Sequence, residues 1–223
     1  MLRYNENRIG RESSVHWGLW FSWLLAGMLG EPLAWIAVLF GVVPLQELLP
    51  TSLLSLSICL GLLGALLYGL VVGFAQSLAL RRWLRGFSQS PWMRFTVVGG
   101  TARCLLILVF GGMILLGDIN IEPTVGIIYV LVLGALAGMA TGSMQYFALR
   151  RYTSAAFWWV PANLVAWLVA MSIWPFTTAI GGYILSGVLL GGISSAITGF
   201  TLVRMLYTKP ASVTEEDILE EMT

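Results

Sequence analysis

Long apolar runs alternate with short polar breaks along the whole chain. The runs span residues 16–43, 53–80, 93–117, 125–149, 157–178 and 180–203. A helix of about 20 apolar residues crosses a bilayer, and each run reaches that length. The breaks are too short to hold a soluble domain. The pattern predicts an all-α membrane protein with six transmembrane helices in a single domain over residues 16–207, preceded by a cytoplasmic segment, 1–15, and followed by an acidic cytoplasmic tail, 208–223.

The composition supports a lipid-embedded chain. Of the 223 residues, 58% are hydrophobic and 10% are charged, whereas soluble domains carry about 25% charged residues. The net charge of +1 and the lack of a basic patch outside the loops give no indication of a nucleic-acid partner. His16 is the single histidine, and both Cys59 and Cys104 lie inside apolar runs. We therefore expect no multi-histidine metal site, no thiolate metal site and no disulfide framework.

The beginning of the chain has the form of a signal peptide, with Arg3, Arg8 and Arg11 before an apolar run. That run meets Gly30, Glu31 and Pro32 instead of a cleavage site with small residues. We favour an uncleaved first helix.

The basic residues predict the orientation of the chain. They follow the second, fourth and sixth runs or open the third, and Arg103 is the one exception within the apolar runs. The opposite loops hold only the acidic residues Glu47, Asp118 and Glu122. Because positive charge marks cytoplasmic loops, both termini are expected in the cytoplasm. The basic residues at the boundary that also suit anionic lipid headgroups are Arg81, Arg82, Arg150 and Arg151.

A repeated motif ends the even-numbered runs. The pattern G-x-x-x-G-x-x-Q-x-x-x-L-R-R occurs at 69–82 and 138–151, and a degenerate copy occurs at 191–204. The small residues of the three copies are Gly69, Gly73, Gly138, Gly142, Gly191 and Ser195, preceded at the same spacing by Ala65, Gly134 and Gly187. Four-residue spacing places them on one helix face, where another helix can approach closely. The repeat predicts three helical hairpins, about 16–82, 93–151 and 157–207, with rough threefold pseudosymmetry and the even-numbered helices packed on one another at the centre.

The motif resembles that of uncharacterised bacterial polytopic membrane proteins with repeated G-x-x-Q-x-x-x-L-R-R hairpins and a Trp-rich start to the next helix. The resemblance covers about residues 60 to 205 and implies a fold without assigning an activity. In this chain the helix starts carry Trp17 with Trp20, Trp92, and Trp158 with Trp159. Tryptophan at a helix start is typical of an interfacial anchor, which we favour over a ligand cage.

Two ionisable residues fall within the apolar runs. Arg103 lies nine residues past Arg94, which places it about 13 Å deep. Glu31 precedes Pro32, which we expect to interrupt the first helix. Charged residues inside a membrane are functional candidates by default. The simplest arrangement is a Glu31–Arg103 ion pair that faces the interior, either as part of a ligand site or as a lock between two helices. Alternatively, the first span ends near Gly30 and Glu31 lies at the interface.

A polar layer is expected nearer the cytoplasmic face. Its candidates are Gln76, Gln145, Asn163 and Thr198, and Thr198 holds the glutamine position in the third copy of the motif. These side chains either form hydrogen bonds between helices or bind a polar ligand group.

The functional alternatives follow from this inventory. Motifs of hydrolases, metalloproteases and phosphate-binding loops are missing, so no catalytic residue is nominated. The favoured function is a small-solute transport or ligand-binding membrane subunit. The alternative is a structural, accessory or assembly subunit of a larger complex.

No cofactor is predicted; bound lipid is expected, and a pigment-binding version of the alternative stays open. The expected partners are the bilayer and a membrane protein or a second copy. The expected location is the bacterial inner membrane, with a thylakoid-type membrane as the other option.

Overall fold

The computed structural model describes residues 3–42, 44–45, 54–84, 86–116 and 123–207, and these residues form an all-helical bundle. Glu47, Asp118, Glu122 and the acidic tail lie outside the described residues. The elements are α1 (Arg3–Gly41), α3 (Leu54–Trp83), α4 (Gln89–Leu116), α5 (Pro123–Leu149), the short 3-10 helix η1 (Ser154–Trp158) and α6 (Trp159–Tyr207).

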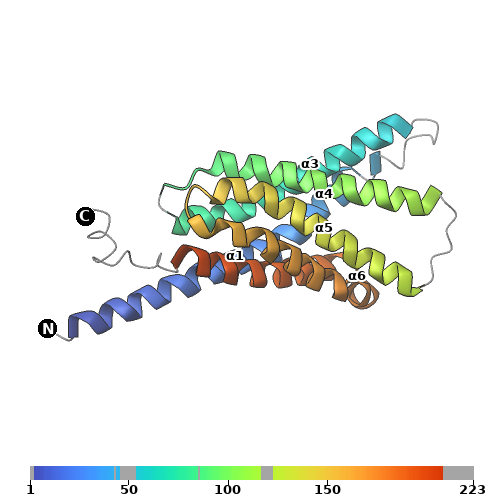
Figure 1. Ribbon diagram of the computed structural model, residues 1–223. Coiled ribbons are helices and arrows are strands. Elements are labelled where there is room, and N and C mark those ends of the chain that lie inside the picture. Colours follow the sequence, from blue (N-terminus) through green and yellow to red (C-terminus); the bar gives the residue numbers. More distant parts are fainter. Residues whose placement is uncertain (1–2, 43, 46–53, 85, 117–122, 208–223) are drawn as a thin grey trace, which may run out of the picture.

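α6 contains a sharp break at Gly182, where φ is +66° and ψ is −168°. A positive φ is readily adopted by glycine because it has no Cβ. The chain folds back there, so that α6 consists of one helix before Gly182 and a second after it (Figure 1). The hydroxyl of Thr153 beside η1 donates to the carbonyl of Met205 at 2.9 Å, which joins the start of α6 to its end. The break falls close to the boundary expected between the last two apolar runs.

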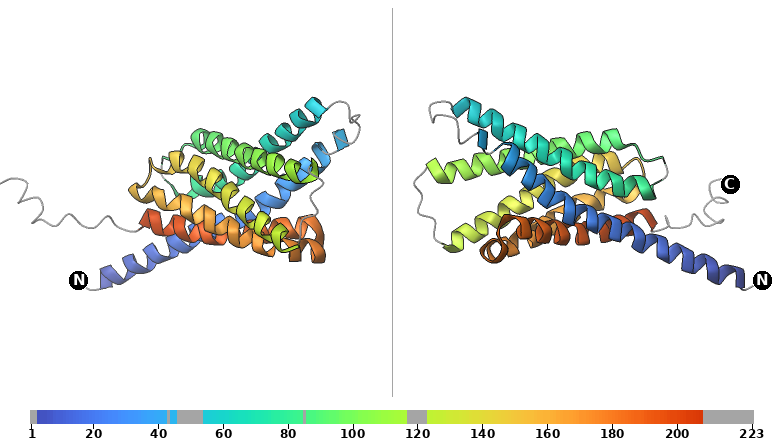
Figure 2. Two further views of the ribbon diagram at one scale, coloured as in Figure 1. Left: turned by 45° about the vertical axis from the view of Figure 1, so that its right-hand side comes forward. Right: turned by 180° about the vertical axis from the view of Figure 1, so that it is seen from behind.

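The helices form a closed ring in chain order. α1 packs against α3, α3 against α4, α4 against α5 and α5 against α6, and α6 then returns to α1. Figures 1 and 2 show successive helices alternating in direction, with the start of α1, the α3–α4 and α5–α6 connections and the end of α6 all at one end of the bundle. We call this the basic end because Arg82, Arg94, Arg150 and Arg204 belong to its helix termini.

Five segments of the described residues are long and apolar enough to cross a membrane. They are Trp17–Gly41, Ile58–Trp83, Val125–Leu149, Ser154–Trp174 and Ile184–Tyr207. The all-α membrane class is confirmed, whereas the predicted number of six spans is not, because α4 is not among the five. The expected interruption at Pro32 is wrong: α1 runs through it to Gly41. The broken helix is α6 instead.

The small-residue stripes on the helices of the second, fourth and sixth apolar runs face the helices of the third, fifth and first runs, so the expected packing of the even-numbered runs on one another at the centre is wrong. A Cβ at Gly69 in α3 would lie 2.9 Å from Val97 Cα in α4. One at Gly138 in α5 would lie 2.5 Å from the carbonyl oxygen of Asn163, and one at Gly191 would overlap the carbonyl oxygen of Gly27. The remaining pairs across these contacts are Gly73 with Thr96, Gly142 with Asn163, Gly134 with Met171, Gly187 with Pro32 and Ser195 with Gly27. In a ring each helix has two neighbours, and each stripe meets the helix that follows it around the ring.

Candidate functional site

The interior of the ring contains a buried charged network. Arg103 of α4 lies with Nη1 3.9 Å from a carboxylate oxygen of Glu31 in α1. Arg103 Nη1 also donates to the hydroxyl of Tyr68 in α3 at 2.8 Å, and Tyr68 donates to the second carboxylate oxygen of Glu31. The Tyr68 hydroxyl therefore bridges the guanidinium of Arg103 and the carboxylate of Glu31. This hydrogen-bond network joins α1, α3 and α4.

The guanidinium of Arg103 also lies over two aromatic rings. Its Cζ lies 3.8 Å from the ring centroid of Trp167 in α6 and 4.8 Å from that of Tyr68. These three residues and Glu31 are 5–6% exposed. The ion pair suggested by the sequence is present. The alternative in which the first span ends near Gly30 is wrong, because α1 continues and Glu31 is buried. The ion pair and the cation–π contacts of Arg103 offset part of the free-energy cost of removing the two charges from water.

A second network surrounds Gln145 of α5, which is 1% exposed. Its amide nitrogen donates to Gln76 Oε1 in α3 and to Thr96 Oγ1 in α4, both at 3.1 Å. Its amide oxygen accepts a hydrogen bond from Trp159 Nε1 at 3.0 Å. The two glutamines of the repeated motif are therefore direct partners. Gln145 links the start of α6 to the α3–α4 pair.

A third group lies where α1 packs against the second half of α6. Trp23 Nε1 in α1 donates to Thr198 Oγ1 in the second half of α6 at 3.0 Å. Thr198 in turn donates to the carbonyl oxygen of Ser194 within its own helix. Asn163 donates to the Trp159 carbonyl oxygen at 2.9 Å, also within its helix. Gln76, Gln145, Asn163 and Thr198 all take part in hydrogen bonds in this region.

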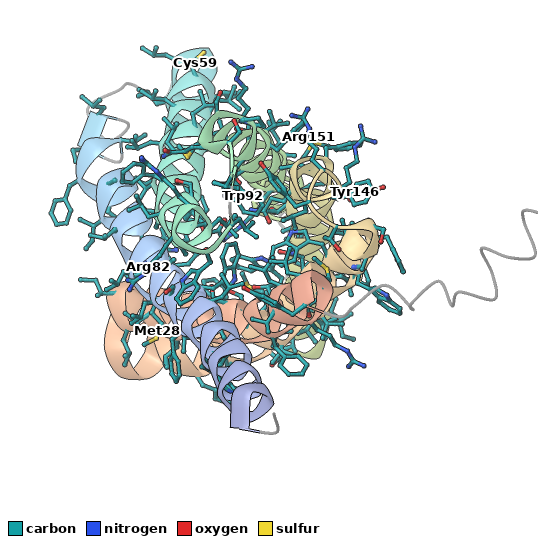
Figure 3. The ribbon with its side chains drawn as sticks, turned by 90° about the vertical axis from the view of Figure 1, so that its left-hand side faces the viewer. Met28, Cys59, Arg82, Trp92, Tyr146 and Arg151 are labelled. Carbon is teal, nitrogen blue, oxygen red and sulfur yellow. The ribbon has the colours of Figure 1, made fainter. Side chains whose placement is uncertain are left out.

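Trp23, Trp92 and Trp159 pack edge to face around one centre, and we call them the Trp cluster. Their ring centroids lie 5.6 to 6.4 Å apart. All three are at most 1% exposed, and Figure 3 places Trp92 near the middle of the helix ring seen from the basic end. The interfacial-anchor interpretation is therefore wrong for Trp92 and Trp159. Trp17 and Trp158 are exposed, as an interfacial anchor would be.

The hydrogen bonds of the Trp cluster follow the sequence repeat with one omission. Trp159 donates to Gln145 and Trp23 donates to Thr198, which occupy the same position of the repeated motif. The corresponding acceptor for Trp92 is Gln76, but Gln76 accepts from Gln145 instead. Trp92 Nε1 is buried without a hydrogen-bond partner among the described residues. Two of the three tryptophans therefore bond to the motif position, and at the third position Gln76 bonds to Gln145 in place of Trp92.

Replacing each member of the Trp cluster by Phe tests this arrangement. All three variants remove similar ring area, but only Trp23→Phe and Trp159→Phe also remove a buried hydrogen bond. We expect these two to lower the free energy of unfolding by about 1 kcal/mol more than Trp92→Phe, because a buried acceptor is left unpaired. Chemical unfolding in detergent micelles measures the difference. Equal losses in all three would contradict a contribution from the indole N–H groups.

A small polar chamber lies between these networks, with a volume of about 40 Å³. Its polar lining comes from every helix of the ring: Glu31, Tyr68, Gln76, Thr96, Arg103, Thr141, Gln145, Asn163, Ser194, Ser195 and Thr198. A water molecule needs about 10–15 Å³ of such space, so the chamber has room for one to a few water-sized species. The ion pair and the polar layer, which the sequence treated separately, line the same space. Among the described residues, no three His, Cys, Asp or Glu side chains are grouped to share a metal ion.

The sequence interpretation missed Tyr68, Trp167, Thr96 and Trp23. A four-residue spacing contained a signal: 23, 27 and 31, then 92, 96 and 100, then 159, 163 and 167 lie on single faces of α1, α4 and α6. These faces are the ones that meet the small-residue stripes. Tyr68 had no signal beyond a phenol in an apolar helix, which needs a partner when buried.

The proposed headgroup residues Arg81, Arg82, Arg150 and Arg151 are exposed at the basic end and lie away from the chamber.

Comparison of the chain with models of protein families, with curated proteins and with solved structures finds no match.

Proposed function

We propose that this protein binds a small polar species in the central chamber and transports it across the membrane. The observation that carries the proposal is the chamber itself, in which a carboxylate, a guanidinium and uncharged polar groups from every helix converge. Charged side chains are expensive at membrane depth and usually mark a pathway or a binding site.

The volume of the chamber restricts the cargo. Pockets for organic ligands enclose about 300–1,000 Å³, far more than the 40 Å³ available here. A water molecule, a proton carried on a side chain or a small cation such as Na⁺ or NH₄⁺ fits. Because Glu31 and Arg103 compensate each other, the oxygens of Glu31, Thr96 and Gln145 offer ligands for a small cation without a net repulsive charge.

The membrane arrangement that goes with this function adds one span to the five long apolar helices. We propose that α4 is the sixth, which makes three repeated hairpins of the kind the motif predicts. The stripe of each hairpin then contacts the first helix of the next, and the ring closes with threefold pseudosymmetry. The basic end is proposed to face the cytoplasm of a bacterial inner membrane, with both termini on that side.

A second candidate is a structural or accessory subunit, and a specific observation favours it. Most polar groups around the chamber have partners within the protein, as expected of a lock that holds helices together. A bound pigment or a co-purifying membrane protein would support this candidate. Stabilisation by a small ion supports transport instead.

The test compares ion flux and thermal stability in matched variants. Asn163→Leu and Ser194→Ala each remove polarity from the chamber while losing only a hydrogen bond within their own helix. Thr101→Val is the control, because Thr101 also bonds within its helix and does not line the chamber. We expect wild type and Thr101→Val in liposomes to conduct H⁺, Na⁺, K⁺ or NH₄⁺, and the chamber variants to conduct at least fivefold less. If wild type neither conducts any of these ions nor gains thermal stability from them, the structural candidate replaces transport.

A further inference from the structure

A second cavity lies on the outer surface of the bundle, in the angle between α1 and α3, and we call it the α1–α3 groove. It encloses about 730 Å³ and does not share its lining with the central chamber. Leu25, Leu29 and Leu33 line it on α1, and each is more than half exposed. This groove is therefore accessible from the lipid phase.

The α3 side of the groove has a polar end. Leu70, Phe74, Leu78 and Arg82 line it at four-residue spacing, which places them on one helix face. The three apolar side chains are 45–51% exposed. Arg82 is exposed and is the one charged residue among the lining residues. Figure 3 places Arg82 beside α1, at the basic end of the bundle.

The dimensions suit one lipid chain. From Leu70 to Arg82 the helix rises about 18 Å, close to the ~15 Å that one leaflet contributes to the hydrocarbon core. A chain lying along the leucines therefore brings its phosphate to the level of Arg82. A guanidinium at the end of an apolar groove complements a negatively charged headgroup, and the cytoplasmic leaflet is the anionic one.

We infer that the α1–α3 groove is a binding site for an anionic phospholipid, with an acyl chain along Leu29 and Phe74 and the phosphate on Arg82. The inference is independent of the chamber and of transport. It differs from general lipid contact in two ways. It requires one particular arginine, and it requires an open groove.

The experiment measures lipid retained after extraction from vesicles of equal parts phosphatidylglycerol and phosphatidylcholine, by native mass spectrometry of the full chain. Arg82→Gln is compared with Arg81→Gln, because Arg81 is its exposed neighbour outside the groove. We expect Arg82→Gln to lower the ratio of retained phosphatidylglycerol to phosphatidylcholine about fivefold, the effect of one basic residue near an anionic surface. Arg81→Gln should leave the ratio near that of wild type.

A second variant tests the groove itself. Leu29→Trp fills the space with a larger side chain at an exposed position, so it should reduce retention of both lipids without lowering the thermal stability. Equal loss of preference in Arg81→Gln and Arg82→Gln would overturn the inference, since the effect would then be diffuse charge. Unchanged retention in Leu29→Trp would overturn it as well. The inference would also be overturned if Leu29→Cys formed disulfide-linked dimers and Leu29→Trp shifted the wild-type protein from dimer to monomer. A second copy would then occupy the groove.

Discussion

Arg103→Ala is expected to lower the free energy of unfolding by about 3–5 kcal/mol, the typical loss when one partner of a buried ion pair is removed. The carboxylate of Glu31 would stay buried with Tyr68 as its remaining partner. The Trp167 ring would also lose the guanidinium stacked on it. Gln76→Ala is expected to cost less than about 2 kcal/mol, because it removes one interhelical hydrogen bond between uncharged groups. Chemical unfolding in mixed micelles compares the two variants.

The paired variant Glu31→Gln/Arg103→Gln provides the control for Arg103→Ala. It removes both charges together, so no uncompensated charge is left in the interior. We expect it to be more stable than Arg103→Ala despite carrying two substitutions. Similar, small losses in Arg103→Ala and Gln76→Ala would show that the Arg103 charge is not held in a buried pair. If the double variant stays folded and loses ion flux, the charges serve transport as well as stability.

Gly191→Ala is the second variant with a large expected effect. Its Cβ would overlap the carbonyl oxygen of Gly27 and meet the side chain of Glu31, so α1 and α6 would have to separate. The neighbouring Gly192→Ala gains the same helix propensity. Its Cβ would lie 3.2 Å from Met28 Cγ, and a methionine side chain adapts readily. We expect Gly191→Ala to lose about 1–3 kcal/mol or more of unfolding free energy, and Gly192→Ala to stay within about 0.5 kcal/mol of wild type.

Thermal unfolding of both glycine variants, with cross-linking between α1 and α6, checks this expectation. Equal stability of the two would contradict the close approach at Gly191. Because alanine raises the helix propensity at both positions, loss of stability in both would show that the Cβ is poorly accommodated at Gly192 as well, and that the close backbone approach at Gly191 is not what distinguishes the two positions. Because Gly191 also borders Glu31, Gly191→Ala should reduce ion flux if the chamber is the site.

Much of the candidate site was within reach of the sequence. Glu31 and Arg103 stood out because ionisable residues are rare in apolar runs, and their pairing followed from similar depth. Gln76, Gln145 and Thr198 stood out because a motif repeats them. Trp23 and Trp167 did not, since a tryptophan in a membrane helix usually indicates an interfacial position. The Gln145–Gln76 bond could not be predicted, because Gln145 and Trp92 both come from other helices and only the packing decides which of them reaches Gln76.

The sequence by itself determined that the chain lies in lipid and that its secondary structure is helical. Apolar runs of this length with so few charges leave helices in lipid as the only arrangement that satisfies the backbone. Four-residue spacing also determined which small residues share a helix face, because that face depends on local geometry alone.

Only the tertiary structure decided which helix each face meets. It showed that each stripe contacts the helix that follows it around the ring, that α1 passes through Pro32 while the chain turns back at Gly182, and that the ion pair and the polar layer line one chamber. The physical reason is that helix faces come from neighbours in the chain, whereas their partners depend on the closure of the whole ring.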